Sequence, residues 1–472
     1  MITQKRTKII TTIGPASETK ETIKKLFDAG MTTIRLNFSH GDYEEQGARI
    51  KHVMALRKEL NLPISILLDT KGPEIRVGKF KDGKKQVEAG QEVTIYTDAK
   101  SYKEKECDTG EMTVSYDMSQ DLAPGKVVLV DDGKLQLQVT SVEDKKVITK
   151  AFNHHVVKGN KRVNLPGTKF SMPFLAQKDK DDIRYGAREK VDFIAASFVN
   201  TPEDIQEIKA ILKEENAEHI KVFAKIESQY AVDHFDKILE VADGIMVARG
   251  DLGLEIPYYD VPVAQKMMVR KSRKVGKPVI IATQMLDSME NNPHPTRAEV
   301  TDVYLATESG ADATMLSGES AAGEYPVKSV EVMATINKRA EQEFYNKVYY
   351  TEYLKNIPEP KPGSREEKAK VVTIKARNGN YKFAVVLSRT GQLLSEVAKL
   401  RPNTNILGVT NDQKQVTLFG ITSSVFMYPE VEAFNKIKAD KSQAREVVKR
   451  FGAKEGDKYL VVENDQIEEF TF

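Results

Sequence analysis

The sequence predicts a closed barrel of eight βα units with two further domains attached to it. Short apolar runs recur along the chain and, apart from one long gap, start roughly 20–30 residues apart, as in a strand–helix repeat. The runs are almost continuously apolar, which is typical of parallel strands buried on both faces. Helix-like stretches separate them. The eight runs are Lys8–Ile13, Thr33–Phe38, Ile64–Asp69, Phe193–Val199, Val222–Glu227, Ile245–Asp251, Val279–Gln284 and Ala313–Ser317.

Most of these runs end in charged or hydroxyl residues. In a barrel of this kind, functional side chains lie at the carboxyl ends of the strands, so these residues should meet at one rim. Cationic side chains together with carboxylate and hydroxyl oxygens suit the binding of phosphate groups and metal ions. The residues at the strand ends are Arg35, Asn37, Ser39, Asp69, Thr70, Lys225, Glu227, Arg249, Asp251 and Thr283.

The long gap, from Asp69 to Phe193, has the pattern of a small all-β domain inserted into one βα loop. We assign it to residues 73–170, between barrel segments 1–72 and 171–350, with hinges at Pro73 and Pro166-Gly167. A position over the rim suits a mobile lid that excludes water from the site. The alternative is an inserted domain that is rigidly attached and does not move. Its expected strands are Glu92–Tyr96, Lys126–Val130, Leu135–Val139 and Val147–Phe152, with turns at Asp82-Gly83, Pro124-Gly125 and Asp132-Gly133.

The last part of the chain, residues 351–472, reads as a separate open α/β domain. Two helix-like segments, Val327–Ala340 and Glu341–Leu354, precede it, and the Pro- and Gly-containing stretch Ile357–Arg365 is the expected linker. Strand and helix patterns then alternate through Phe383–Leu387, Leu393–Leu400, Ile406–Val409, Leu418–Val425, Phe434–Phe451 and Lys458–Val462.

Composition excludes several classes of protein. The net charge of +2 is too balanced to predict nucleic acid or an anionic membrane as partner. Cys107 is the only cysteine, so no intrachain disulfide is possible and a reducing compartment is expected. No apolar stretch approaches the ~18 residues that a membrane-spanning helix needs. We therefore expect a cytoplasmic protein.

The second strand carries the first candidate site. Its residues alternate, so its polar side chains share one face. A guanidinium there suits a phosphate group bidentately, and the neighbouring amide and hydroxyl oxygens suit a monovalent cation or water. The alternative is a polar face on an edge strand. The polar residues are Arg35, Asn37 and Ser39.

Two further candidate sites follow from the other strand ends. Asp69 and Thr70 add oxygens beside those of the second strand, and four oxygens of low total charge fit K⁺ better than Mg²⁺. Glu227 and Asp251, on neighbouring strand ends, suit one divalent cation, with Lys225 beside it. Further candidates are Arg76 for a second phosphate, the backbone N–H groups near Gly250 for a carboxylate, and the Thr283 hydroxyl.

Taken together, these segments resemble the pyruvate kinase family. The resemblance is strong from Lys8 to about Pro326 and weak in the last domain. The segments that carry it are Arg35–Gly41, Asp69–Arg76, Lys225–Glu227, Arg249–Gly253, Ala282–Leu286, Pro295–Glu299 and Met315–Ser320.

The resemblance implies transfer of the phosphoryl group of phosphoenolpyruvate to ADP, giving pyruvate and ATP in glycolysis. It implies that Glu227 and Asp251 bind Mg²⁺ or Mn²⁺. It also implies that the enzyme requires K⁺, because family members with a glutamate at the position of Glu74 depend on K⁺. The K⁺ ligands would be Asn37, Ser39, Asp69 and Thr70.

The remaining roles are implied in the same way. Arg35 and Lys225 would contact the transferred phosphoryl group, with Lys225 stabilising the transition state. Thr283 and the backbone at Gly250 and Asp251 would hold the substrate carboxylate, and Thr283, through water, is the candidate proton donor to the enolate. The nucleotide would face Asn37, His40, Arg76 and Lys178.

The chain departs from the family pattern in two places. Ser228 replaces a common asparagine, and the C-terminus lacks the Gly- and Thr-rich loop that wraps a sugar-phosphate effector in many relatives. A candidate effector-phosphate site remains at Ser388, Arg389, Thr390 and Gly391. A homotetramer is expected by resemblance. The competing hypotheses are a metal-dependent enolpyruvate lyase or aldolase and a catalytically silent metabolite sensor.

Overall fold

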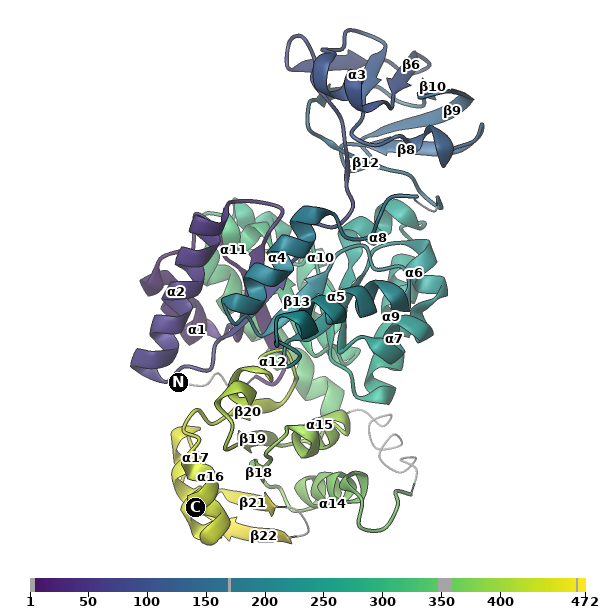
Figure 1. Ribbon diagram of the computed structural model, residues 1–472. Helices are drawn as coiled ribbons and strands as arrows, with labels where there is room; N and C mark the ends of the chain where they lie inside the picture. Colours follow the sequence, from purple (N-terminus) through teal and green to yellow (C-terminus); the bar gives the residue numbers. More distant parts are fainter. Residues whose placement is uncertain (1–4, 169–170, 347–358, 464–465) are drawn as a thin grey trace.

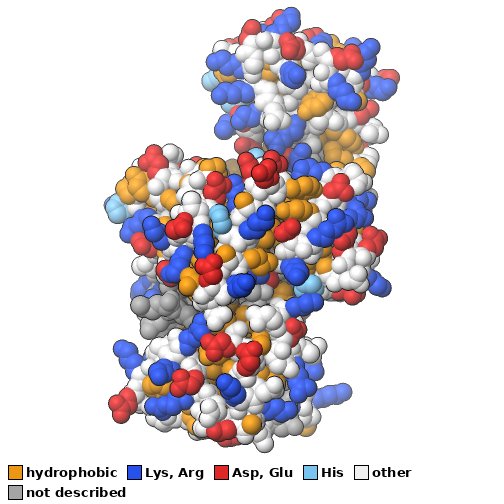
Figure 2. Space-filling view, turned by 60° about the vertical axis from the view of Figure 1, so that its left-hand side comes forward, with side chains coloured by type: hydrophobic (Ala, Val, Ile, Leu, Met, Phe, Trp, Pro, Cys, Tyr) orange, Lys and Arg blue, Asp and Glu red, His pale blue; other side chains and the backbone are white. Residues whose placement is uncertain are grey.

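The computed structural model describes residues 5–168, 171–346, 359–463 and 466–472 of the 472-residue chain. Three bodies are stacked along its long axis, with a barrel in the middle, a strand-rich domain above it and an α/β domain below it (Figure 1). The space-filling view shows a narrow neck between the upper body and the barrel (Figure 2). We refer to the upper body as the lid and to the lower one as the C-terminal domain.

The barrel has the predicted fold. Its eight strands close in the order β1-β17-β16-β15-β14-β13-β3-β2, and every neighbouring pair is parallel. The strands are β1 Lys8–Thr12, β2 Thr33–Asn37, β3 Ser65–Asp69, β13 Phe193–Ala196, β14 Lys221–Ile226, β15 Gly244–Ala248, β16 Val279–Ala282 and β17 Ala313–Leu316. Each overlaps one of the eight predicted apolar runs, because strands buried on both faces need apolar residues at nearly every position.

Helices surround the barrel (Figure 1). Local sequence signals set their ends: Thr296 accepts a hydrogen bond from the backbone N–H of Glu299 and forms a capping box with that residue at the start of α10. The helices are α1 Lys20–Ala29, α2 Tyr43–Leu60, α4 Gln177–Arg188, α5 Pro202–Glu214, α6 Gln229–Asp233, α7 Phe235–Val241, α8 Arg249–Glu255, α9 Val261–Val275, α10 Arg297–Glu308, α11 Gly318–Ala321 and α12 Pro326–Asn346.

Helix α12 differs from the sequence prediction. We predicted a break between Ala340 and Glu341, but one helix runs through both residues as far as Asn346. Neither glycine nor proline interrupts this stretch, and Ala340 is fully buried, so packing continues across the predicted break. The rest of the predicted second segment, to Leu354, lies outside the described residues.

The lid is built on a seven-stranded sheet with the order β4-β12-β8-β9-β10-β6-β7, and a separate pair, β11 and β5. It has its own apolar core, and its described residues include a short α-helix, α3 Ala99–Glu104, and a 3-10 turn, Met118–Gln120. The strands are β4 Ile75–Arg76, β5 Lys84–Val87, β6 Glu92–Tyr96, β7 Glu111–Thr113, β8 Val127–Val130, β9 Leu135–Glu143, β10 Lys146–Ala151, β11 His155–Lys158 and β12 Arg162–Asn164.

The C-terminal domain has a five-stranded sheet with the order β20-β19-β18-β21-β22, in which only β22 is antiparallel to its neighbour. Two expectations are corrected. Arg365, placed in the linker, begins helix α14, and the segment Phe434–Phe451 is divided between two short helices. The elements are α14 Arg365–Asn378, β18 Phe383–Leu387, α15 Gln392–Lys399, β19 Asn405–Val409, β20 Val425–Met427, α16 Ala433–Ala439, α17 Ala444–Arg450, β21 Lys458–Glu463 and β22 Gln466–Thr471.

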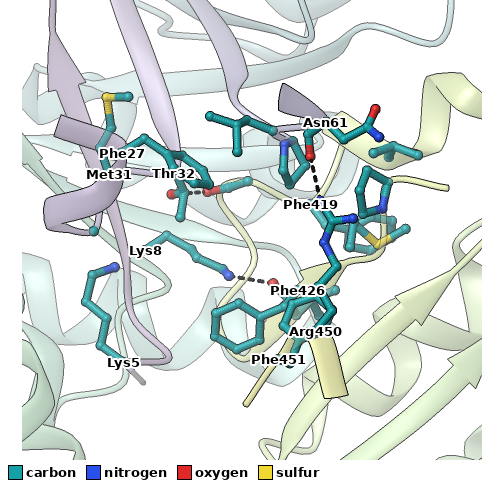
Figure 3. A pocket seen from close by; sticks show the side chains of 18 residues that line it. Lys5, Lys8, Phe27, Met31, Thr32, Asn61, Phe419, Phe426, Arg450 and Phe451 are labelled. Atoms are coloured by element: carbon teal, nitrogen blue, oxygen red, sulfur yellow. Dashed lines mark hydrogen bonds between the residues drawn. The ribbon is translucent and has the colours of Figure 1, made fainter. Parts of the chain in front are cut away.

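The C-terminal domain packs against the end of the barrel opposite the lid (Figure 1). Ile421 belongs to the same apolar cluster as Ile10 and Phe223 inside the barrel, so the C-terminal domain closes the barrel floor. Beside it is an apolar pocket in which the ammonium group of Lys8 donates to the carbonyl of Val425 (Figure 3). In the described part of the chain, no helix is both long and apolar enough to cross a membrane.

Candidate active site

The carboxyl ends of the barrel strands form a polar pocket beneath the lid. It lies where the sequence predicted a site, and basic side chains on the underside of the lid approach acidic ones at the rim there (Figure 2). The functional side chains lining it are Arg35, Asn37, Ser39, His40, Asp69, Lys71, Glu74, Arg76, Arg162, Ser197, Lys225, Glu227, Asp251 and Thr283.

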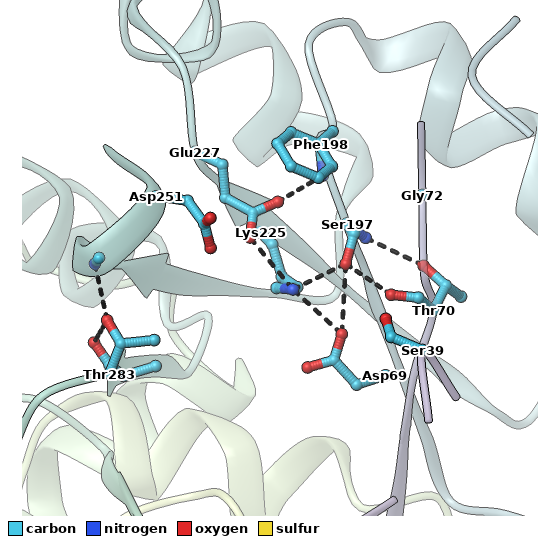
Figure 4. Close-up of polar contacts among 12 residues, drawn as sticks. Ser39, Asp69, Thr70, Gly72, Ser197, Phe198, Lys225, Glu227, Asp251 and Thr283 are labelled. Atoms are coloured by element: carbon cyan, nitrogen blue, oxygen red, sulfur yellow. Dashed lines mark hydrogen bonds and ion pairs between the residues drawn. The ribbon is translucent and has the colours of Figure 1, made fainter. Parts of the chain in front are cut away.

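Asp69 lies at the centre of a network of charged groups. Its carboxylate accepts from the Arg35 guanidinium at 2.6 Å. It also accepts from the Lys225 ammonium at 3.1 Å, and Lys225 donates to the Ser197 hydroxyl at 2.7 Å (Figure 4). Burial by itself raises the pKa of Asp69, but the charges of Arg35 and Lys225 outweigh it and the pKa is lowered. Burial likewise opposes the charge of Lys225, yet Asp69 and Glu227 raise its pKa. Both groups are therefore ionised at neutral pH.

Glu227 is the least satisfied carboxylate of the site. One oxygen, Oε2, accepts from the backbone N–H of Phe198 at 2.6 Å. The other, Oε1, is buried and has no hydrogen-bond partner, although the Lys225 ammonium lies 3.1 Å away. Burial raises the pKa of Glu227 to about 7, and the nearby Asp251 contributes to this. Oε1 therefore has Lys225 as its one nearby cation and still has unused hydrogen-bonding capacity among the described residues.

The carboxylates of Glu227 and Asp251 lie near one another on neighbouring strand ends (Figure 4). Within the described ranges, no group of three or more His, Cys, Asp or Glu residues is arranged to hold a metal ion. Two carboxylates, one with an orphaned buried oxygen, fit a hard divalent cation that takes its other ligands from water and substrate oxygens. The residues present therefore fit the predicted metal.

Thr283 has an unusual backbone. Its φ is 68°, and that of the following Gln284 is 52°, in a region that β-branched residues rarely adopt. The Thr283 hydroxyl accepts from the backbone N–H of Gly250 at 2.7 Å and donates to the carbonyl of Ala282 at 2.6 Å. The N–H of Gly250, predicted to bind the substrate carboxylate, thus has Thr283 as its partner here.

The four predicted K⁺ ligands lie at the ends of two adjacent strands, with Asn37 opposite Asp69 in the register and Ser39 and Thr70 just beyond the strand ends. Asn37, Ser39 and Asp69 line the pocket. Thr70 lies behind them, where its hydroxyl accepts from the N–H of Ser197 at 3.1 Å and its carbonyl from the Ser197 hydroxyl at 2.7 Å. Three of the four oxygen-bearing residues therefore face one space.

The predicted nucleotide residues are only partly brought together. His40 and Arg76 also line an adjoining hollow that extends to the lid residues Tyr102 and Tyr116. Lys178 donates to the carbonyl of Phe38 and to Asp182 at 2.6 Å, and is not among the residues lining either space. The predicted effector residues Ser388–Gly391 lie between β18 and α15 in the C-terminal domain, apart from the site.

Comparison with known proteins identifies the family. Residues 4–330 match the model of the pyruvate kinase barrel domain. This chain belongs to the pyruvate kinase family. It is 42% identical over 414 residues to the pyruvate kinase of Clostridium acetobutylicum, covering 87% of this chain and 85% of the relative. It is also 42% identical over 460 residues to that of Mycoplasma pneumoniae, covering 90% of each chain.

A solved structure agrees with this assignment. The structure of a pyruvate kinase from Cryptosporidium parvum matches with a TM-score of 0.91 at 34% identity, covering 99% of this chain and 96% of that one. As a pyruvate kinase, the chain is a phosphotransferase whose substrates and products are phosphoenolpyruvate, ADP, ATP and pyruvate, an activity that generally requires a divalent metal. The predicted fold and function are confirmed.

Three residues of this pyruvate kinase site escaped the sequence analysis. Ser197 and Phe198 follow strand β13, so the strand-end rule that found Asp69 would have found them too. Phe198 has a φ of 56°, which directs its N–H to Glu227. Arg162 comes from lid strand β12, and nothing in the sequence signals that it reaches the barrel.

Proposed function

We propose that this pyruvate kinase uses Mg²⁺ or Mn²⁺ held by Glu227 and Asp251 together with K⁺ near Asn37, Ser39, Asp69 and Thr70. The observation that supports the proposal best is the orphaned, buried Oε1 of Glu227 beside the Lys225 ammonium. Lys225 offsets part of the charge of this oxygen, but a buried carboxylate oxygen without a hydrogen-bond partner still costs free energy that a bound metal ion would reduce.

Phosphoryl transfer requires positioning and the neutralisation of charge more than acid–base chemistry. Arg35 and Lys225 are charged and are held in place by Asp69, so both are oriented before substrate arrives. We assign to Lys225 the stabilisation of the charge that develops on the transferred phosphoryl group. A divalent cation, when bound, supplies further neutralisation for the substrate oxygens.

The remaining groups bind substrate or act on the enolate. Thr283 and the backbone at Gly250 and Asp251 hold the substrate carboxylate in this proposal, and the Thr283 hydroxyl, through water, delivers a proton to the enolate. Asn37, His40, Arg76 and Lys178 face the nucleotide. The side chain of Glu74 is 1% exposed and bonded to Arg76 at 2.6 Å, and it supports the K⁺ requirement by keeping an additional negative charge at the pocket.

Other parts of the proposal concern the whole enzyme. We propose that residues 73–170 form a mobile lid between barrel segments 1–72 and 171–350, and that residues 351–472 form a separate domain. A homotetramer in the cytoplasm is proposed from family membership. Ser388, Arg389, Thr390 and Gly391 remain the proposed phosphate site for an effector.

The test is an assay of pyruvate formation from phosphoenolpyruvate in which ADP, Mg²⁺ and K⁺ are each omitted in turn. Loss of activity on each omission is expected. Turnover without ADP would indicate a lyase or phosphatase instead, and full activity without K⁺ would exclude the proposed K⁺ ligands and the role of Glu74. No turnover under any condition would favour the metabolite sensor.

The role of Lys225 has a matched test on its own strand. Lys225→Met should lower kcat by about 10²-fold or more, because it removes a preorganised positive charge from the reacting group. Lys221→Met is the control, since Lys221 lies at the opposite end of β14 and its ammonium is 4.0 Å from Asp243. Equal activity of the two variants would contradict the assignment.

A further inference from the structure

One arginine of the lid reaches into the barrel site. Arg162 begins strand β12, where it lies opposite Arg76 of β4. Its guanidinium donates to Oε1 of Glu74 at 2.7 Å and also to Oδ1 of Asp251 (Figure 1 shows β12 above α8). Glu74 lies in the segment that leads into the lid and Asp251 lies in α8 of the barrel, so one side chain joins the two bodies.

The charges around the pocket show why this contact matters. Asp69 is paired with Arg35 and Lys225, and Glu74 has Arg76 as a second partner. Among the residues that the structure describes, Asp251 forms its ion pair with Arg162. Arg162 therefore supplies to Asp251 the positive charge that a divalent cation would supply.

The lid meets the barrel at this same place. Beside Arg162, a Cβ built on Gly133 of the lid would lie 3.1 Å from the side chain of Leu254 in α8. Glu255, the last residue of α8, lines one pocket together with Gly167 of the lid hinge. The Arg162 guanidinium is also 6.0 Å from the ring of Phe198, whose N–H holds Glu227. The guanidinium thus forms the charged part of a continuous lid–barrel contact.

We propose that Arg162 is an internal counter-ion that competes with the divalent cation for Asp251 and docks the lid while the cation is absent. The proposal rests on the metal site proposed above. A guanidinium on Oδ1 of Asp251 neutralises the carboxylate and takes one of its acceptor positions, so Arg162 and a metal ion compete for this side chain. Cation binding then releases Arg162 and loosens the contact between the lid and α8.

This competition has a measurable consequence. A site that is available in only a fraction of the molecules binds with an affinity reduced by that fraction. Without Arg162 the site is always available, and Asp251 carries an uncompensated charge that attracts a cation. We therefore expect removal of the guanidinium to tighten divalent-cation binding by about tenfold. This is the factor expected if the Arg162–Asp251 ion pair blocks the site in about nine of ten metal-free molecules.

The experiment compares Mn²⁺ binding to the full-length wild type and Arg162→Met, without substrates, by electron paramagnetic resonance of free Mn²⁺. Arg162→Met keeps an unbranched apolar stem but removes the charge, and tighter binding is expected. Lys161→Met is the matched control, because Lys161 is the adjacent lid cation and pairs with Asp131 at 2.7 Å instead. Unchanged or weaker binding by Arg162→Met would overturn the proposal.

Hydrogen exchange provides a second readout that does not depend on activity. Peptides covering β12 and α8 should exchange faster in metal-free Arg162→Met than in the metal-free wild type. Mn²⁺ should increase exchange in the wild type and have little further effect in the variant. Protection that is equal in all four samples would overturn the docking role.

Failure of the metal site itself would look different. If the wild type binds no Mn²⁺, or if Asp251→Asn binds it as well as the wild type, the proposed cation site is wrong. Mn²⁺ binding that depends on Asp251 but not on Arg162 would leave the cation site intact and exclude only the competition.

Discussion

Backbone strain occurs at two residues of the candidate site. Phe198 and Thr283 both have positive φ values, which cost about 1–3 kcal/mol each for residues with such side chains. Strain of this kind persists only where surrounding contacts determine the conformation. Here the backbone of Phe198 directs an N–H to Glu227, and that of Thr283 places a hydroxyl against Gly250. The strained residues are therefore part of the site rather than neighbours of it.

The role of the Thr283 hydroxyl group can be tested separately from that of the branched shape of the side chain. Thr283→Val keeps the branched side chain but removes the proposed proton route and the acceptor for the N–H of Gly250. We expect exchange of the methyl protons of pyruvate with solvent, followed by NMR, to slow by about 10²-fold or more. Thr283→Ser retains the hydroxyl and should stay within about tenfold of the wild type. Exchange at the wild-type rate in Thr283→Val would exclude Thr283 as the route.

The raised pKa of Glu227 predicts how cation binding depends on pH. With a pKa of about 7, the carboxylate is mostly protonated below pH 7, and a proton then competes with the metal. The Mn²⁺ affinity of the wild type should fall about fivefold from pH 7 to pH 6 and about tenfold per unit below that. Glu227→Gln should bind weakly and show no such dependence. An affinity that is constant from pH 6 to pH 8 would contradict this prediction.

The same shift acts on the stability of the metal-free protein. Folded Glu227 holds its proton more tightly than the unfolded chain, in which the ordinary value is 4.5. Its contribution to stability is therefore fully present below pH 4.5 and is lost as the pH rises through about 7. A bound cation removes this loss, so the stabilisation by Mn²⁺ should be larger at pH 8 than at pH 6.

Residues at strand ends were accessible to sequence reasoning, whereas contacts across domains were not. Asp69 and Lys225 follow from the rule that barrel chemistry lies at the carboxyl ends of strands. The rule gives no partners, so it did not show that Asp69 is bonded to Arg35. Arg162 lies on a lid strand 89 residues before Asp251, and its position depends on how two separately folded bodies meet.

At the scale of elements, the strands were easier to predict than the helices of the C-terminal domain. Barrel strands are buried on both faces and therefore read as continuous apolar runs. Helix α14 was missed because it buries only a narrow stripe of small and medium-sized residues among many charged ones. Its buried residues are Ala369, Val372, Thr373 and Ala376. The long α12 was divided because its pattern was interpreted without the helices that pack against it.

The segment that leads into the lid offers a test at this scale. Gly72 has a φ of 69°, and a Cβ there would lie 2.8 Å from the Cβ of Ser197 and 3.0 Å from the ring of Phe198. Gly72→Ala should therefore displace the residues that hold Lys225 and Glu227. We expect kcat/KM to fall by about 10²-fold, because small displacements of positioning groups are costly in catalysis.

Gly83 is the matched control for that variant. Its φ of 72° is similar, but a Cβ there would meet nothing within 4 Å. Gly83→Ala should therefore carry only the backbone strain, about 1–2 kcal/mol, with little change in kcat/KM. Equal losses of activity in the two variants would show that strain, and not contact with the site, accounts for the effect.

At the scale of the whole molecule, the barrel forms different kinds of junction with the lid and with the C-terminal domain. The lid has its own apolar core, separate from that of the barrel. The C-terminal domain instead inserts Ile421 into the barrel interior and forms buried hydrogen bonds to it, including that of Ser65 to the carbonyl of Thr417 at 2.6 Å. Such a junction favours a fixed arrangement.

A buried ion pair at this junction gives the last prediction. Arg401 of the C-terminal domain donates to Asp312 of the barrel at 2.6 Å, and each side chain is 6% exposed. Arg401→Met removes this ion pair and leaves the Asp312 carboxylate, among the described residues, with the backbone donors Val279 and Ser423, so the buried charge loses its paired guanidinium. Removing one partner of such a pair destabilises proteins by about 3–5 kcal/mol, and the thermal unfolding midpoint should fall accordingly.

The control for Arg401→Met is Arg450→Met, at the rim of the same junction. Arg450 pairs with Glu430 at 2.9 Å, but the two side chains are 35% and 47% exposed, so its loss should cost about 1 kcal/mol or less. Neither variant should change kcat by more than about twofold at a temperature where both are folded, because the junction lies at the end of the barrel opposite the site. A large fall in kcat without a fall in the unfolding midpoint would mean that the C-terminal domain acts on the site by a route other than stability.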